Sequence, residues 1–383
     1  MFFLCGPLCP LWLIFLNFRR VFPWINPVTL LADMAEATRV NVVVIGYGFA
    51  GRSFHTYLVG LEPRLRLHGV CARDPEKRAK ASLERQCKTY ENVDDVLADK
   101  DVDLVVLATP HDTHAPLAIQ ALNAGKHVVS DKVMCLNGRE CDAMIAAAER
   151  TGKLLTVFHN RRWDGDLLTV KHLMDTGKLG DVRWLEMSWQ RYGVWGGWRS
   201  TIEKGGGRLY DLGAHMIDQA LHLFPEPVES VHARVRREWE HAPTESAAMV
   251  TINFTTGRTA IIDTASMNRW SKPRWHVVGR DGTFVKWGED PQEPAMIAGN
   301  IDSAKEPADK FGKLYTGQTK TGHEATTIET LPGRWRNFYE NVADVLLNGA
   351  TPAVTLPQMR KLMSVFDAIF ESEKSGQVVK LNA

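Results

Sequence analysis

The chain has 383 residues, of which 44% are hydrophobic and 24% charged, and its formal net charge is +1. This length exceeds one typical domain, and the composition is that of a globular protein with ample apolar residues for a core. The charge balance gives no electrostatic reason to expect nucleic acid or an anionic membrane as a partner, so we expect neither.

The first 37 residues (1–37) form an N-terminal extension ahead of the first recognisable strand. They are apolar from Met1 to Leu16, and two arginines follow this run. A secretory signal carries its positive charge before the apolar run, and a bilayer span needs about 20 apolar residues, so the segment fits neither pattern. We interpret Met34 as the start of translation, in preference to a membrane anchor, and we expect a cytoplasmic protein.

The six cysteines follow no zinc-binding spacing and are too sparse for a disulfide scaffold. We therefore interpret them as reduced thiols of a cytoplasmic protein, and we expect no metal site. They are Cys5, Cys9, Cys71, Cys87, Cys135 and Cys141.

Strands and helices alternate over the first half of the chain. Runs of apolar, mostly β-branched residues are typical of parallel strands that are buried on both faces. The alternation predicts right-handed βαβ units around a doubly wound parallel sheet, an α/β domain that we place at residues 38–159. The expected strands are 40–45, 65–72, 103–108, 127–130 and 154–158, and the expected helices follow the turn at 46–51, begin at 74–76, and cover 115–124 and 137–150.

The pattern changes after about residue 160. Alternating segments and tight turns at 255–257 and 281–282 predict an α+β domain over 160–383, with a large, mostly antiparallel open sheet. We expect its C-terminal helices to pack back towards the first domain, and its open sheet face to bury itself in a homodimer or homotetramer. The expected strands are 182–190, 228–239, 247–254, 258–265, 275–279 and 282–287; the expected helices are 166–176, 334–347 and 358–374; and 291–329 is expected to be a long loop.

The turn after the first strand reads Gly46-Tyr47-Gly48-Phe49-Ala50-Gly51, a G-x-G-x-x-G motif between a buried strand and a helix. In this context the motif indicates a dinucleotide-binding Rossmann domain. Gly46 permits the tight turn, Gly48 lets the backbone approach the pyrophosphate, and Gly51 lets helix and strand pack closely. The start of the helix supplies N–H donors to the phosphates, so the motif predicts NAD or NADP as cofactor.

The end of the second strand bears on the choice between these two cofactors. NAD sites usually place an acidic residue there to bind the ribose hydroxyls, whereas here Ala72 takes that position and Arg73 follows it. Because a guanidinium can bind the 2′-phosphate, we predict NADP in preference to NAD. A shift of one residue would make Asp74 the ribose ligand, but we prefer to interpret it as the N-cap of the next helix.

Two further segments carry polar residues where such a fold needs them. Lys132 lies just beyond the carboxyl end of a parallel strand, where ligands bind, although a solvated surface lysine is the alternative. A triple glycine at 205–207 leads into a helix on which Asp211 and His215 share one face. Asp211 could orient His215, which could exchange a proton near neutral pH; a capping Asp and a buried structural His are the alternative.

These segments, in this order, resemble the glucose–fructose oxidoreductase, inositol dehydrogenase and MocA-type (Gfo/Idh/MocA) family from about residue 38 to the C-terminus. The family's strand that ends in Thr-Pro with a nearby His corresponds to Thr109, Pro110 and His114. Its Gly-Lys-His run leading to a Glu-Lys-Pro motif corresponds here to Asp131-Lys132-Val133. Its Asp-x-x-x-His pair on a glycine-led helix corresponds to Asp211 and His215.

The resemblance implies a role for each of these residues. Lys132 would contact the reacting hydroxyl and the nicotinamide ribose. His215 would be the general base in oxidation and the general acid in reduction, and Asp211 would support it or share the proton. The cofactor site would include the residues of the glycine motif together with Arg73, Thr109, Pro110, His114 and Asp131.

The chain departs from the family pattern at three positions. Asp131 replaces the usual Glu, a mild change, and His111 stands where many members have Asn. Val133 replaces the usual Pro, which can form a cis peptide bond that Val would resist. We therefore expect Lys132 to be displaced from its family position.

Substrate contacts are expected beside the cleft and in a loop at 191–199 that is rich in tryptophan and glycine. Aromatic faces with polar side chains suit a sugar or cyclitol ring. Trp163 and Trp184, in contrast, are expected in the core. The candidate contacts are Asn160, Arg162, Arg191, Trp195, Trp198 and Asp218.

The sequence therefore predicts an NAD(P)-dependent oxidoreductase that transfers hydride to or from a carbohydrate-like alcohol or ketone. One alternative is a redox-neutral, NAD-dependent glycoside hydrolase, in which a tightly held cofactor oxidises the substrate only transiently. A second alternative is a non-catalytic ligand sensor on the same fold, because fold alone does not determine function.

Overall fold

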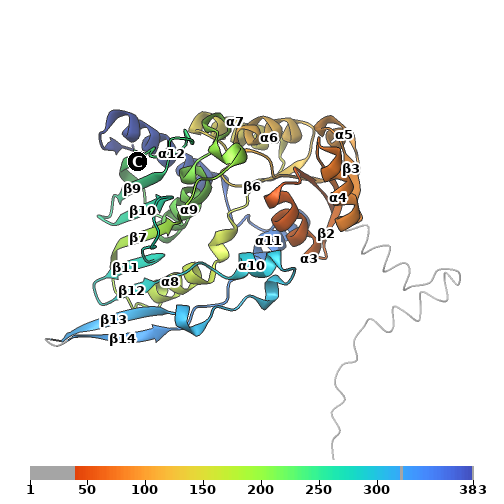
Figure 1. Cartoon of the computed structure of the whole chain (residues 1–383). Coiled ribbons are helices and arrows are strands. Elements are labelled where there is room, and N and C mark those ends of the chain that lie inside the picture. The colour runs from red at the N-terminus through yellow and green to blue at the C-terminus, as the bar shows by residue number, and fades with distance from the viewer. Residues whose placement is uncertain (1–38, 320–321, 382–383) are drawn as a thin grey trace, which may run out of the picture.

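The computed structural model describes residues 39–319 and 322–381 (Figure 1). The expected extension at 1–37 and the expected start at Met34 lie outside these residues. Within the described ranges, no helix is long and apolar enough to cross a membrane. The described chain builds two sheets, and helices from its C-terminal part cross back to the first sheet.

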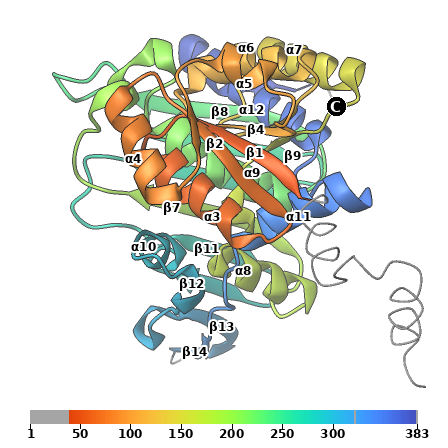
Figure 2. The ribbon, with the colours of Figure 1, turned by 90° about the vertical axis from the view of Figure 1, so that its right-hand side faces the viewer.

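The first sheet has six parallel strands in the order β3-β2-β1-β4-β5-β6. Side chains of the central strands are fully buried because helices cover both faces, with α6 and α7 on one side and α3 on the other (Figure 2). The strands are β1 (Val40–Ile45), β2 (Leu65–Cys71), β3 (Lys88–Tyr90), β4 (Leu104–Leu107), β5 (His127–Ser130) and β6 (Leu155–Val157). The helices are α3 (Thr56–Leu61), which continues a π-helical turn at Ala50–His55, α4 (Pro75–Arg85), α5 (Val93–Ala98), α6 (His114–Asn123) and α7 (Gly138–Thr151).

The second sheet has nine strands in the order β14-β13-β12-β11-β7-β10-β9-β8-β15. Its neighbours are antiparallel except β7 and β10, which run parallel, so the expected mostly antiparallel sheet is confirmed. The strands are β7 (Val182–Gln190), β8 (Val228–Arg236), β9 (Ala247–Phe254), β10 (Thr259–Ala265), β11 (Trp275–Gly279), β12 (Thr283–Lys286), β13 (Gly312–Thr319), β14 (Gly322–Ile328) and β15 (Val379–Lys380). The longer helices here are α8 (Gly165–Asp175), α9 (Ala214–Leu223), α10 (Gln292–Ile297), α11 (Arg336–Asn348) and α12 (Leu356–Ser375).

The two faces of the second sheet differ in burial. On β9, Val250 and Ile252 are buried under helices, whereas Met249 points to the opposite face and is 47% exposed. Trp184 of β7 lies on the same open face and is 39% exposed, so its expected place in the core is wrong. Its neighbours in the strand are Arg183 and the buried Leu185, and alternation alone does not say which face is covered. Trp163 is partly buried against the core.

The expectation of a long loop at 291–329 is also wrong, because this segment forms α10 and the hairpin β13–β14. The hairpin extends the sheet at its edge, as the blue strands in Figure 1 show. Leu314 of β13 pairs with Phe284 of β12 and is buried, but most described side chains of the hairpin remain accessible. An edge hairpin buries too little to carry an apolar alternation, so the sequence pattern did not reveal it.

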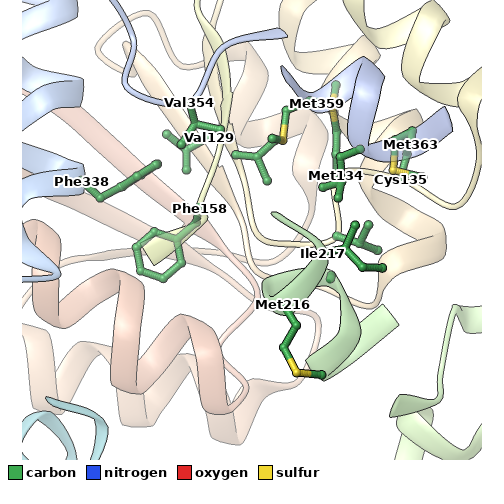
Figure 3. Packing of buried hydrophobic residues seen from close by; sticks show 14 of the residues in the cluster. Val129, Met134, Cys135, Phe158, Met216, Ile217, Phe338, Val354, Met359 and Met363 are labelled. Atoms are coloured by element: carbon green, nitrogen blue, oxygen red, sulfur yellow. The ribbon is translucent and has the colours of Figure 1, made fainter. Parts of the chain in front are cut away.

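The C-terminal helices join the two halves of the molecule. Helix α11 packs beside α3, and α12 packs against both α7 and β8. Figure 3 shows Met359 and Met363 of α12 near Met134 and Cys135, which follow β5, with Ile217 of α9 close by. This apolar packing holds the start of α9 against the segment after β5, where the polar residues of the site lie.

Candidate active site

A cavity of about 790 Å³ lies at the carboxyl ends of β1, β2 and β4. The strand order reverses between β1 and β4, which is where ligands bind in open parallel sheets. The whole segment 46–50 lines this cavity, together with Thr109, Pro110 and Asp131. These sequence-predicted residues therefore come together at one cavity.

Glycine is required at the positions of the motif for different structural reasons. Gly46 adopts a φ of +102°, a conformation that L side chains rarely adopt. A Cβ on Gly51 would lie 2.0 Å from the Gly46 carbonyl oxygen, so only glycine lets the helix approach the strand this closely. A Cβ on Gly48 would meet nothing within 4 Å, because this position faces the open cavity. The cavity therefore leaves room for a phosphate group beside the backbone, and its residues fit a dinucleotide.

The contrast between these two glycines gives a first prediction. Gly51→Ala should lower the free energy of unfolding by about 1–3 kcal/mol, because the added methyl group overlaps backbone. Gly48→Ala should leave thermal unfolding unchanged but weaken dinucleotide binding, because the methyl group keeps the phosphate away from the backbone N–H groups, and losing one hydrogen bond to a charged group costs about 1.5–3 kcal/mol, or tenfold and more in affinity. Thermal unfolding and fluorescence titration of both variants test this, and equal behaviour of the two would contradict it.

The far end of the cavity contains Ala72, Arg73, Asp74 and Lys77. Ala72 is buried, and Arg73 is exposed. The Asp74 carboxylate accepts a hydrogen bond from the backbone N–H of Glu76, so its expected role as the N-cap of α4 is confirmed. Lys77, which the sequence reasoning missed, lies one turn along α4 and adds a second cation to this end of the cavity.

His114 has a different place from the one expected. It is fully buried, and its two ring nitrogens lie 2.8 Å from the Val133 carbonyl and 3.0 Å from the Thr109 carbonyl. It does not line the cavity. His114 therefore ties the end of β4 to the segment after β5, and its action on a cofactor would be indirect. His111 does line the cavity, and burial lowers its pKa to about 3.

The Lys132 side chain is directed to Asp211, just before the start of α9, and its displacement from the family position stays a prediction. The Lys132–Val133 peptide bond is cis although Val133 replaces proline. The Lys132 ammonium group donates to the Asp211 carbonyl at 2.7 Å and to the Asp211 carboxylate. Arg199 Nε also donates to that carboxylate, at 3.2 Å. Burial alone would raise the pKa of Asp211, but these two cations lower it to about 2.

A second pocket of about 350 Å³ adjoins the first. Asp131, Lys132, Arg199 and Asp211 line both pockets, so the two meet at this charged cluster. Asp131 is kept ionised: burial alone would raise its pKa, but the neighbouring His55 and Lys132 hold it below its usual range.

His215 lines the second pocket and is almost fully buried. Burial, with added repulsion from Lys132 and Arg161, holds its pKa well below the ordinary value of 6.5, so the ring is neutral at neutral pH. Its Nδ1 is buried and has no hydrogen-bond partner among the described protein groups. The Asp211 carboxylate pairs with Lys132 and Arg199 rather than with His215. A direct Asp211–His215 hydrogen bond is therefore not what orients this ring.

The six candidate substrate contacts separate into three groups. Asn160, Arg191 and Trp195 line the second pocket, whereas Trp198 lines the first. Arg162 and Asp218 line neither; they form a buried ion pair with each other, and Arg162 also reaches the Ala353 carbonyl and Gln358. Their place in the fold corrects the expectation: this pair ties α9 to the segments after β6 and before α12.

Other residues of the second pocket were missed by the sequence reasoning. Trp189, at the end of β7, has the Arg161 guanidinium over its ring at 4.5 Å. Arg161 also forms ion pairs with Asp164 and Glu293. Glu293 comes from the segment that was expected to be a loop, so no sequence signal placed it here. Among the described residues, no group of three or more His, Cys, Asp or Glu side chains is placed to hold a metal ion.

A doubly wound sheet with this glycine turn, and a second pocket that meets it at Lys132 and Asp211, define a NAD(P)-binding oxidoreductase. Residues 40–159 match the family model described as the oxidoreductase family, NAD-binding Rossmann fold, and residues 167–285 match the GFO/IDH/MocA C-terminal domain. The chain belongs to the Gfo/Idh/MocA oxidoreductase family.

Similarity to individual proteins extends over nearly the whole chain. The scyllo-inositol 2-dehydrogenase (NADP(+)) IolW of Bacillus subtilis is 31% identical, over 92% of this chain and 99% of its own length. The oxidoreductase YdgJ of Escherichia coli is 32% identical, over 88% of this chain and 96% of its own. The solved structure of the oxidoreductase yvaA from Bacillus subtilis superposes with a TM-score of 0.84 at 30% identity, covering 90% of this chain and 98% of that chain.

Proposed function

We propose that the protein catalyses NADP-dependent hydride transfer to or from a carbohydrate-like alcohol or ketone, such as a sugar or a cyclitol. The observation that carries this proposal is the junction of the two pockets at Lys132 and Asp211, with His215 on the second pocket. A substrate in the second pocket would contact a cofactor in the first pocket close to the Lys132 ammonium group and the neutral His215 imidazole.

The residues of this junction suit an alcohol–ketone interconversion. When bound, the nicotinamide supplies or accepts the hydride at its C4 atom. Lys132 donates a hydrogen bond to the reacting oxygen and stabilises negative charge that develops on it. His215 is neutral, so it can take the hydroxyl proton in oxidation and return it in reduction. Asp211 holds Lys132 in place through its carbonyl and carboxylate oxygens.

The lining of the second pocket supports a polyhydroxylated ring as substrate. Trp189 and Trp195 contribute aromatic side chains to the pocket lining, and Asn160, Arg161 and Arg191 contribute hydrogen-bond donors. Such a mixture binds the apolar face of a ring and its hydroxyl groups together. The similarity to a scyllo-inositol 2-dehydrogenase (NADP(+)) at 31% identity supports this substrate class.

A turnover screen tests the substrate class. The full chain, with NADP⁺ and separately with NADPH, is offered inositols, aldoses, their ketone counterparts and simple aliphatic alcohols, and the absorbance of NADPH is followed. We expect turnover with a cyclitol or sugar and none with the simple alcohols. Tight cofactor retention without net turnover would point instead to a redox-neutral hydrolase, and no NADPH binding at all to a non-catalytic protein.

The preference for NADP rests on Arg73 at the end of β2, next to the small Ala72. Arg73→Ala should weaken NADPH binding about 10- to 100-fold, because a charge-assisted hydrogen bond to the 2′-phosphate is lost, and should leave NADH binding unchanged. Lys80→Ala, which removes an exposed cation from the helix that follows Arg73, α4, without touching the cavity, is the matched control. Tighter binding of NADH than NADPH by the unmodified chain would refute the preference.

We also propose a homodimer or homotetramer that uses the open face of the second sheet. Trp184 and Met249 are large apolar residues that are exposed on this face, which favours its burial in an interface. Light scattering after size-exclusion chromatography tests the assembly. The double variant Trp184→Asp, Met249→Asp should have the mass of one chain. A mass of one chain for the unmodified protein would contradict the proposal.

A further inference from the structure

His215 lacks the partner that its chemistry requires. To accept a proton from a hydroxyl group in the pocket, its pocket-facing nitrogen must be bare, so the hydrogen of the neutral ring must sit on the other nitrogen. That other nitrogen is Nδ1, which is buried without a partner among the described protein groups. A buried donor without an acceptor costs about 1–3 kcal/mol, so an acceptor close to Nδ1 is expected.

His159 is a buried histidine whose ring lies beside that of His215. It follows β6, its side chain is 1% exposed, and its ring centroid lies 6.4 Å from that of His215 at an interplanar angle of 89°. Both of its ring nitrogens are buried without a hydrogen-bond partner among the described protein groups. The separation is too long for a direct hydrogen bond between the rings but fits one bridging water molecule, and two orphaned polar atoms are the setting in which buried water is found.

On its other side, the His159 ring lies close to a carboxylate. Its Nδ1 lies 3.6 Å from Asp218 Oδ2, and Asp218 is held by a bidentate contact with Arg162. An N–H on Nδ1 therefore points to a carboxylate, which leaves Nε2 as the acceptor of His159. Burial lowers the pKa of His159 to about 4, although Asp218 opposes this shift, so the ring is neutral at neutral pH.

We propose that His159 is a positioning residue that fixes the tautomer of His215 through one water molecule, a role that rests on the proposed function of His215. The His215 Nδ1–H donates to the water, the water donates to His159, and the His159 N–H faces Asp218. The chain of polar groups then ends at a carboxylate that is itself held by Arg162. The arrangement leaves Nε2 of His215 bare in the pocket and stabilises the imidazolium when it forms, as hydrogen-bonded partners behind reactive histidines do.

The kinetic test compares two substitutions at this position. His159→Phe should lower kcat for alcohol oxidation about 10- to 100-fold, with KM and NADPH binding unchanged, because only the positioning of the base is lost. His159→Gln, which can accept and donate, should restore part of that loss. His172→Phe, at an exposed histidine of α8 that lines neither pocket, is the matched control and should retain full activity.

The pH profile separates positioning from packing. The charged and titratable groups that face the His159–His215 pair are Asp131, Lys132, Arg161, Arg162, Asp218 and Arg274. His159→Phe leaves all of these in place but cuts the link from His215 to Asp218, which stabilises the imidazolium. The acid limb of kcat/KM should therefore move to lower pH, whereas a variant that only loosens packing would leave the limb where it is.

An NMR measurement that requires no turnover tests this inference independently of the proposed function. In the ¹⁵N-histidine NMR spectrum, signals of His215 are identified by their loss in His215→Asn, and they should report an Nδ1–H tautomer. In His159→Phe the same signals should move towards the Nε2–H tautomer. If the chain turns over no substrate but the tautomer responds in this way, the proposed function fails and the inference stands. An unchanged tautomer, or an unchanged kcat in an active protein, would overturn it.

Discussion

Lys132→Met should abolish most hydride transfer while leaving the protein folded and able to bind NADPH. We expect kcat to fall about 10²- to 10⁴-fold, the range for a group that donates to a reacting oxygen. The reason is geometric: the Lys132 ammonium group stands where the two pockets meet, and methionine has similar length but no donor. Steady-state kinetics with the best substrate of the screen measures the effect, and NADPH titration shows whether the first pocket is intact.

The Lys132→Met prediction has a matched control and an effect on acid stability. Lys204→Met removes an exposed lysine that lines neither pocket and should retain full activity. In the unmodified chain the pKa of Asp211 is lowered from 3.8 to about 2. Its ionised carboxylate therefore stabilises the folded state at pH values above 3.8, and this stabilisation is lost as the pH falls towards 2. Without Lys132 this contribution shrinks. A variant that keeps kcat within tenfold would remove Lys132 from the mechanism.

His215→Asn should lower kcat by a similar factor, about 10²- to 10⁴-fold, because asparagine retains hydrogen bonding but cannot take up a proton. In the unmodified chain, oxidation requires the neutral imidazole and fails as pH falls through the pKa of His215. Since that pKa is well below 6.5, the acid limb of kcat/KM should lie below pH 6.5. A limb at pH 6.5 or above would contradict the burial-based argument.

The same buried histidine makes a testable contribution to stability. In the unfolded chain His215 takes up a proton near its ordinary pKa of 6.5, whereas the folded chain resists protonation. The unfolded state therefore binds more protons below pH 6.5, and the free energy of unfolding decreases as pH falls through that region. His215→Asn should make this decrease shallower. Denaturant unfolding between pH 5 and 8, compared with the unmodified chain, measures the difference.

Structural elements that are marked by a local sequence pattern could be predicted from the sequence. The strand β4 is a continuous apolar run and β1 is nearly so, and the glycine turn at 46–51 sits between a strand and a helix, so these elements could be located directly. The hairpin β13–β14 could not, because its side chains are largely accessible and its alternation carries no apolar signal. Trp184 shows the same limit in another form: a tryptophan in a strand can face helices or solvent.

The sequence by itself determined the class of fold, the location of the cofactor cavity and the choice of Lys132, Asp211 and His215 as candidate site residues, because each lies in a segment with a recognisable pattern. Only the tertiary structure decided how they pair. Asp211 and His215 share a helical face by spacing, yet the carboxylate turns to Lys132 and Arg199, since these two cations, of which Lys132 lies 79 residues away in the chain, attract it more strongly than a neutral ring. Likewise, His159 meets His215 only because α12 and the core hold α9 against the first sheet. Partners that are far apart in the chain leave no periodic signal in the sequence.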